Sequence, residues 1–232
     1  MRATHTRVLS YLGIILALGA SALLPGIAGA QPSVSGEAVG FQGNSLLDFP
    51  LFEQYYECTG VGPASQQFPD FGDALLQAAD DFNVSGTYFL EQVVAVGSFS
   101  LSGPMGPVTF EIYANDGPGN LPGTLVCSEV GITSTGDLSL IDIDLDGSCE
   151  LTTGTYWISV YPAMAFDEFG QWFWSSNEIG YGSEFVFQDP EGLVGNPCST
   201  WGLGITDCGI GASYPNLCFG LGGFESCGDD GD

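Results

Sequence analysis

The sequence has almost no basic residues: it holds 28 acids against two arginines or lysines and one histidine. Both arginines, Arg2 and Arg7, and the histidine, His5, lie within the first 30 residues, and lysine does not occur. Residues 31–232 therefore carry 28 acids and no basic side chain, which is a formal charge of 0 − 28 = −28.

This absence excludes several classes of function. Without histidine or lysine, residues 31–232 cannot supply a Ser-His-Asp or Cys-His catalytic group, a histidine metal ligand, a Schiff base or a P-loop. A uniformly negative surface repels nucleic acid and anionic lipid, so we expect no nucleic-acid partner. Stability must come from core burial, backbone pairing, disulfides and cations of the medium, because no ion pair between side chains is available.

The first 30 residues have the layout of a secretory signal peptide. A basic start is followed by an apolar run, a Pro25-Gly26 break and the small residues Ala28 and Ala30. An uncleaved membrane anchor is the alternative that the apolar run allows. We expect cleavage after Ala30, no membrane insertion afterwards, and a secreted or cell-surface product.

The seven cysteines favour disulfides over a metal site. They are Cys58, Cys127, Cys149, Cys198, Cys208, Cys218 and Cys227. A zinc site would need close pairs such as C-x-x-C, which do not occur, whereas an exported chain favours disulfides. The spacing leaves the connectivity open. We predict a bond between Cys127 and Cys149, pairing within the last four cysteines, and an anchoring role for Cys58.

After residue 70 the chain alternates apolar and polar residues between glycine-rich turns, which predicts β-strands. The expected strands are Leu75–Val84, Tyr88–Ser100, Pro107–Ala114, Gly123–Val130, Leu138–Leu145, Thr155–Tyr161, Gln171–Ser175, Glu184–Gln188 and Asn216–Leu221. Short strands at this spacing are typical of an all-β, two-sheet antiparallel sandwich. We expect one sandwich domain over 73–225, after an N-terminal strand and irregular wrapping segment (31–72) and before an acidic, disordered tail (226–232).

Four segments in this order resemble a jelly-roll-like β-sandwich module of secreted bacterial proteins, including cell-surface proteins. The segments are "QAADDFNVSG" (77–86), "FEIYANDGPGNLPGT" (110–124), "LTTGTYWISV" (151–160) and "QWFW" (171–174). The resemblance covers residues 75–222 and implies an extracellular β-sandwich. It implies no activity, since these modules are generally uncharacterised. The chain departs from many of them in its cysteine-rich end and in lacking a C-terminal anchor.

The segment "IDIDLDGSCE" (141–150) allows two interpretations. As a calcium loop, Asp142, Asp144 and Asp146 would be ligands, but position twelve would be Thr153 instead of glutamate. As a strand, the Ile and Leu residues face the core and the aspartates face water, and Asp146 with Gly147 makes the next turn. We favour the strand.

Two other acidic segments are candidates for a structural calcium site. Asp80 and Asp81 lie on opposite faces of one expected strand, so at most one would point inward, where it needs backbone N–H groups, hydroxyls or a metal. Asn115 and Asp116 offer oxygen ligands in a turn. The alternative in each case is a solvated turn.

The aromatic strand around residue 172 is the candidate ligand site. Trp172 and Trp174 share one face of it, and if that face is exposed they form a platform that stacks on sugar rings. Asp167 and Glu178 would then accept hydrogen bonds from sugar hydroxyls. The alternative is that both tryptophans lie in the core.

We therefore predict an exported, non-enzymatic β-sandwich with a role in adhesion, extracellular matrix or envelope structure. Its expected partners are extracellular polysaccharide or a cell-surface protein, and its expected cofactor is at most structural calcium. The alternative is a carboxylate-dependent glycoside hydrolase or polysaccharide lyase, with Asp167 and Glu178 as the pair to test.

Overall fold

A computed structural model of the chain describes residues 46–101, 105–136, 139–210, 212 and 214–226. The chain divides into two units, residues 1–37 and 38–232, and every described residue belongs to the second. The predicted signal peptide, Cys227 and nearly all of the predicted tail lie outside the described residues. No helix within the described part is long and apolar enough to cross a membrane.

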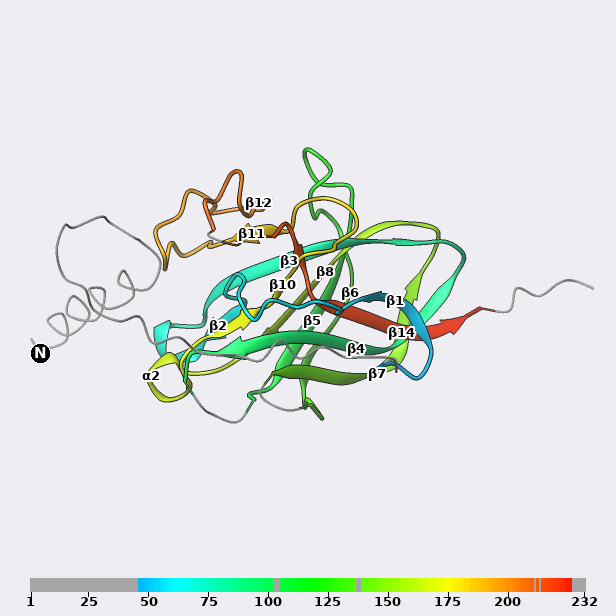
Figure 1. Cartoon of the computed structure of the whole chain (residues 1–232), viewed down its shortest axis with the longest axis horizontal. Helices are drawn as coiled ribbons and strands as arrows, with labels where there is room; N and C mark the ends of the chain where they lie inside the picture. Colours follow the sequence, from blue (N-terminus) through cyan, green and yellow to red (C-terminus); the bar gives the residue numbers. More distant parts are fainter. Residues whose placement is uncertain (1–45, 102–104, 137–138, 211, 213, 227–232) are drawn as a thin grey trace, which may run out of the picture. The chain divides into compact units, whose positions relative to one another are not determined.

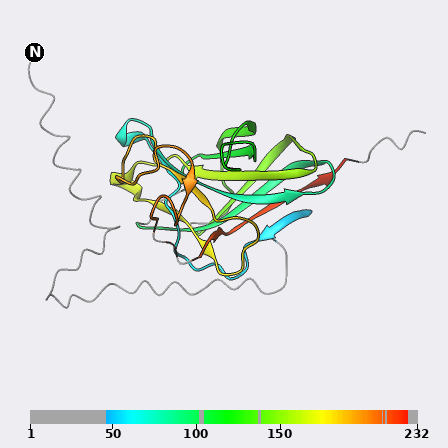
Figure 2. The same cartoon turned by 90° about the horizontal axis from the view of Figure 1, so that it is seen from above.

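Five antiparallel strands form the first sheet, in the order β1-β14-β4-β7, with β9 paired to β4. Their bounds are β1 Pro50–Gln54, β4 Tyr88–Phe99, β7 Leu140–Leu151, β9 Trp172–Trp174 and β14 Phe219–Glu225. The first and last strands of the described chain, β1 and β14, run side by side in this sheet (Figures 1 and 2). The fold is therefore closed by pairing between its two ends.

Seven antiparallel strands form the second sheet, in the order β12-β11-β3-β8-β5-β6, with β2 paired to β3 (Figure 1). Their bounds are β2 Gln66–Phe68, β3 Ala74–Val84, β5 Val108–Ala114, β6 Leu125–Ile132, β8 Gly154–Pro162, β11 Val186–Gln188 and β12 Gly202–Leu203. A separate pair joins β10 (Ser176–Asn177) to β13 (Asn216–Leu217). Two short helices, η2 (Pro69–Phe71) and α2 (Phe166–Phe169), lie in connections.

One hydrophobic core lies between the two sheets. Alternate residues of β3, such as Ala78 and Phe82, share it with Val93 and Ala95 of β4. Because side chains alternate across a strand, one face of each sheet fills this core. The predicted all-β sandwich fold is confirmed.

The strand predictions agree with the structure within a few residues, with three corrections. The expected strand Asn216–Leu221 is divided between β13 and β14, which belong to different sheets. Asp146 and Gly147 do not make a turn: β7 continues to Leu151 through an irregularity opposite Glu91. The expected single strand in 31–72 is two strands in its described part, β1 and β2, and each pairs with a different sheet.

The acidic run of β7 has the alternation of a strand. Ile141 and Ile143 are fully buried, Leu145 is 9% exposed, and Asp144 and Asp146 are exposed. Gly147 has φ of 75°, a left-handed conformation that glycine adopts without strain, and it allows the irregularity. The strand interpretation is confirmed.

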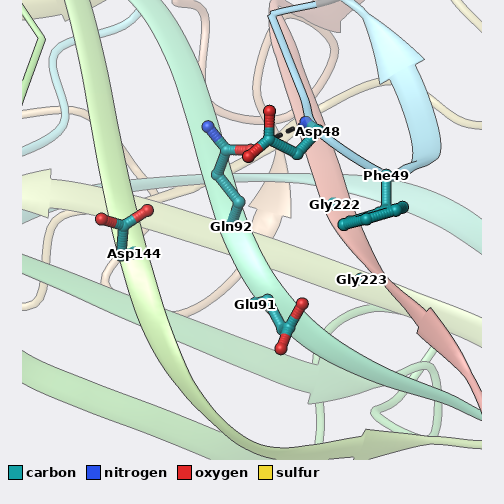
Figure 3. A pocket seen from close by; sticks show the side chains of 7 residues that line it. All are labelled: Asp48, Phe49, Glu91, Gln92, Asp144, Gly222 and Gly223. Atoms are coloured by element: carbon teal, nitrogen blue, oxygen red, sulfur yellow. Dashed lines mark hydrogen bonds between the residues drawn. The ribbon is translucent and has the colours of Figure 1, made fainter.

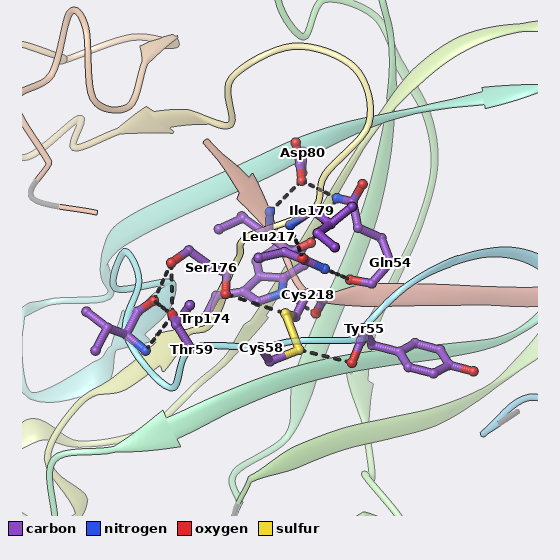
Figure 4. The surroundings of a disulfide bond; sticks show 12 residues. Gln54, Tyr55, Cys58, Thr59, Asp80, Trp174, Ser176, Ile179, Leu217 and Cys218 are labelled. Carbon is purple, nitrogen blue, oxygen red and sulfur yellow. Dashed lines mark hydrogen bonds between the residues drawn. A yellow bond between two sulfur atoms is a disulfide. The ribbon is translucent and has the colours of Figure 1, made fainter. Parts of the chain in front are cut away.

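Three disulfides fix the described part of the chain: Cys58–Cys218, Cys127–Cys149 and Cys198–Cys208. The bond predicted between Cys127 and Cys149 is confirmed, and it links β6 of one sheet to β7 of the other. Pairing within the last four cysteines is correct for Cys198 and Cys208 and wrong for Cys218. Cys218 instead holds Cys58 (Figure 4), because β1 pairs with β14 and brings the segment after β1 next to it.

Candidate functional site

A shallow depression of about 140 Å³ lies on the outer face of the five-stranded sheet. It is lined by Asp48, Phe49, Glu91, Gln92, Asp144, Gly222 and Gly223 (Figure 3). These residues come from the segment before β1, from β4, from β7 and from β14. We call this feature the Gly222 depression.

Strand register builds the floor of the Gly222 depression. Gln92 of β4 lies opposite Gly222 of β14 on one side and opposite Asp144 of β7 on the other. Both pairings shift register next to Gln92, so Glu91 has no direct partner on either neighbouring strand. Register shifts of this kind redirect side chains and are frequent beside functional sites.

Hydrogen bonds hold the amide of Gln92 in place. Its Oε1 accepts the backbone N–H of Asp48 at 3.3 Å, the contact drawn in Figure 3. Its Nε2 donates to Asp142 Oδ1 at 3.0 Å and to the Leu46 carbonyl at 3.4 Å. The amide is therefore a fixed feature of the floor.

One exposed aromatic ring lines the depression, and a second belongs to the residue that follows Gly223. Phe49 is 64% exposed, and its carbonyl accepts the N–H of Gly223 at 2.9 Å, which fixes the backbone position of this residue. Phe224 is 45% exposed and stacks on Phe89, with ring centroids 5.3 Å apart. Large exposed rings next to polar groups are characteristic of binding surfaces.

Three carboxylates face the depression without hydrogen-bond partners among the described residues: Asp48, Glu91 and Asp144 (Figure 3). No set of three or more Asp, Glu, Cys or His side chains in the described part lies close enough together to hold a metal ion. These carboxylates are therefore available as hydrogen-bond acceptors.

The predicted platform of Trp172 and Trp174 is wrong, and the alternative, that both tryptophans lie in the core, is confirmed. Both rings are 0% exposed, because β9 pairs with β4 and turns this face of the strand into the core. Phe173, on the other face of β9, is the partly exposed residue of the three. The Trp174 Nε1 donates to the Cys218 carbonyl at 2.8 Å, beside the disulfide shown in Figure 4.

The structure does not bring Asp167 and Glu178 together with these tryptophans in one site. Asp167 is exposed in α2, where its backbone N–H donates to Asp70 Oδ2 at 3.1 Å. Glu178 is exposed after β10 and accepts the Tyr214 hydroxyl at 2.8 Å. No contact joins the two carboxylates within the described part of the chain.

Asp80 and Asp81 lie on opposite faces of β3, as expected, so only Asp80 points into the core, but both side chains are buried. Asp80, 0% exposed, faces the core side of β3 and accepts the Leu217 N–H at 2.6 Å and Gln54 Nε2 at 2.9 Å (Figure 4). Asp81, 5% exposed, faces the other side and accepts the Ser183 N–H at 2.6 Å. Segment 181–183 covers this side of β3, and a Cβ at Gly182 would lie 2.5 Å from the Asp81 carboxylate.

Burial raises the pKa of both aspartates. Desolvation raises the pKa of Asp80 well above its ordinary value, and the neighbouring charge of Asp81 adds to the effect. Desolvation also raises the pKa of Asp81, while the bond from Ser183 opposes it. Both carboxylates accept hydrogen bonds from N–H groups, as expected where residues 31–232 hold no cationic side chain.

Asn115 and Asp116 are occupied by contacts within the protein. Asn115 Oδ1 accepts the Trp157 Nε1 at 2.9 Å. Asp116 accepts the backbone N–H of Thr124 at 2.6 Å and its hydroxyl at 2.8 Å, and these bonds lower the pKa of Asp116. The structure does not group them with Asp80 and Asp81, and calcium binding stays a prediction.

All residues of the Gly222 depression except Asp144 could not be singled out from the sequence alone: Asp48, Phe49, Glu91, Gln92, Gly222 and Gly223. Phe49 belongs to an aromatic segment without alternation, and its position depends on the pairing of β1 with β14. The dipeptide Glu91-Gln92 is the one detectable signal, because it places two adjacent polar residues within an apolar strand. Adjacent polar residues in such a strand indicate a register shift.

Comparison with known proteins gives no assignment: no family model matches the chain, and no curated protein is similar to it.

Proposed function

We propose that the protein is an exported, non-enzymatic β-sandwich that binds extracellular polysaccharide, with a role in adhesion, extracellular matrix or envelope structure. The observation that carries this proposal is that the exposed ring of Phe49 and the unpaired carboxylates of Glu91 and Asp144 line one depression. A ring packs against the C–H face of a sugar, and carboxylate oxygens accept hydrogen bonds from its hydroxyls.

The size and the charge of the Gly222 depression restrict the ligand. Its volume of about 140 Å³ is below the roughly 300–1,000 Å³ of pockets that enclose drug-sized ligands. It therefore suits one or two units of a polymer that continues over the open face of the sheet. Acidic polysaccharides are disfavoured, because the chain after residue 30 carries only negative side-chain charge.

The test is retention of the purified protein on a panel of insoluble neutral polysaccharides, with calcium and again with EDTA. Phe49→Ala should lower retention on the bound polysaccharide about tenfold, as removal of an aromatic anchor does in other interfaces. Tyr181→Ala is the matched control, because Tyr181 is 65% exposed against 64% for Phe49 and lies outside the depression. Equal loss in both variants, or retention on no polysaccharide, would overturn the proposal.

Two further measurements belong to the same experiment. Release of reducing ends from any polysaccharide would show a glycoside hydrolase and contradict the non-enzymatic role. A lower melting temperature in EDTA than in calcium, at constant ionic strength, would support a structural calcium ion. Equal melting temperatures in the two buffers would contradict it.

A further inference from the structure

The outer face of the seven-stranded sheet carries a second cluster of polar and aromatic side chains. Phe110 and Ile112 of β5 point into the core, so Glu111 and Tyr113 point outward. Glu111 lies opposite Ser159 of β8, and Tyr113 lies opposite Trp157. The register therefore places one carboxylate next to aromatic rings on two adjacent strands.

Hydrogen bonds fix this carboxylate with neutral donors. Glu111 Oε2 accepts Gln77 Nε2 at 2.6 Å and the Tyr113 hydroxyl at 2.7 Å. Gln77 is 1% exposed, and its Oε1 in turn accepts Gln188 Nε2 at 2.6 Å. The hydroxyl of Tyr161 interacts with the same carboxylate. We call Glu111, Gln77, Tyr113, Tyr161 and Gln188 the Glu111 cluster.

No positive side chain balances the charge of Glu111. Burial raises the pKa of Tyr113 and of Tyr161, and the negative charge of Glu111 raises both further. Residues 31–232 contain no cationic side chain, so within the chain the charge of Glu111 is met only by neutral hydrogen-bond donors. The charge is therefore available to a cation from outside the chain.

One further aromatic ring packs against the cluster at the surface. Trp201 packs edge-on against Tyr113, with ring centroids 5.8 Å apart and planes at 73°. Trp201 belongs to the segment closed by the Cys198–Cys208 disulfide. Glu111, Tyr113 and Trp201 are each partly exposed, so the cluster is reachable from solvent.

We propose that the Glu111 cluster binds a small organic cation of the alkylammonium class. A carboxylate supplies the charge, and the faces of tyrosine and tryptophan rings attract ammonium groups through their quadrupoles. A calcium ion fits less well, because it needs six to eight oxygen ligands and this cluster offers one carboxylate. The site is separate from the Gly222 depression, which lies on the other sheet, and its test is independent of polysaccharide binding.

The experiment titrates the purified protein with choline chloride and follows tryptophan fluorescence and thermal melting. Sodium chloride at equal ionic strength controls for screening, and 3,3-dimethylbutan-1-ol, which has the shape of choline without its charge, controls for apolar contact. We expect choline alone to change the fluorescence saturably and to raise the melting temperature above the sodium chloride value. Identical responses to choline and to either control would overturn the proposal.

Variants locate the site. Glu111→Gln keeps the shape and removes the charge, and it should weaken choline binding about tenfold or more, because the Coulomb attraction between the carboxylate and the ammonium is lost. Glu129→Gln makes the same change on the neighbouring strand β6 and should bind choline like the wild type. Tyr113→Phe keeps the aromatic ring but removes the hydroxyl that positions Glu111. This variant should therefore bind choline more weakly than the wild type. Equal binding by Glu111→Gln and Glu129→Gln would show that general charge attraction, and not this cluster, holds the cation.

Discussion

Asp80 Oδ2 accepts the backbone N–H of Leu217 at 2.6 Å in a site with no solvent exposure (Figure 4). The same oxygen accepts Gln54 Nε2, so one buried carboxylate joins β3 to β1 and β13. Leu217 is next to Cys218, which forms the disulfide with Cys58. Asp80 and this disulfide therefore fasten the same corner of the sandwich.

The first prediction is that the protein loses stability as pH rises above about 4. The pKa of Asp80 and that of Asp81 are raised in the folded state, so the folded protein binds these protons more tightly than the unfolded chain. Their contribution is complete below the unfolded pKa and is lost as pH rises through the folded values. Between the unfolded and the folded pKa of Asp80, the carboxyl is protonated in the folded protein but not in the unfolded chain. In this range each rise of one pH unit lowers the free energy of unfolding by about 1.4 kcal/mol.

Urea unfolding at pH 4, 5, 6 and 7 measures this slope. Asp80→Asn should flatten it, whereas Asp167→Asn, an exposed change of equal charge, should leave it unchanged. The lowered pKa values of Asp116 and Asp146 act in the opposite direction, because their contribution is lost as pH falls below about 4. If the free energy of unfolding falls with pH equally steeply in Asp80→Asn and in the wild type, the pH dependence belongs to other acids.

Much of the fold could be predicted from the sequence, because the alternation of apolar and polar residues along a strand indicates which of its faces is buried. Ile141 and Ile143 alternate with aspartates, and the structure buries the former and exposes Asp144. The burial of Asp81 could not be predicted, because alternation gives the face of a strand but not what covers that face. Segment 181–183 covers the outer side of β3, and its position depends on long-range contacts such as the bond from the Tyr181 N–H to Gln54 Oε1.

The candidate sites were largely beyond prediction from the sequence for the same reason. Trp172 and Trp174 share a face as predicted, but the pairing of β9 with β4 decides that this face is the core. Glu111 and Gln77 are 34 residues apart, and only the sheet order β3-β8-β5 brings them into contact. Neither relation has a local sequence signal.

The second prediction concerns Gly97, which faces Trp172. A Cβ at this position would lie 2.4 Å from the indole ring, which the core holds in place. Gly97→Ala should therefore destabilise the protein by roughly 1–3 kcal/mol, the usual cost of overpacking a core. Gly154→Ala is the control, because its Cβ would meet Tyr156 at 3.4 Å, an ordinary contact distance. Denaturant unfolding compares the two variants, and equal stability would mean that the Trp172 ring can move.

The third prediction ranks the disulfides. Cys58–Cys218 joins residues 160 positions apart, Cys127–Cys149 spans 22 and Cys198–Cys208 spans 10. Loop-closure entropy gives about 5, 3.4 and 2.7 kcal/mol for these bonds. Replacing both cysteines of a bond by serine should therefore cost most for the first pair. Thermal melting of the three double variants gives the order, and a greater loss at Cys198–Cys208 would show that local packing outweighs the entropy of the unfolded chain.

The last prediction is that salt stabilises the protein strongly. The 28 acids after residue 30 repel one another without any compensating side chain, and folding brings them closer together. Raising the ionic strength from 0.01 M to 1 M shortens the screening length from about 30 Å to about 3 Å, which removes most of this repulsion. The melting temperature should therefore rise steadily with sodium chloride and level off near 1 M. Magnesium chloride at equal ionic strength separates screening from ion binding, because coincident melting curves in the two salts indicate screening alone. A melting temperature independent of salt would show that repulsion among the acids does not limit stability.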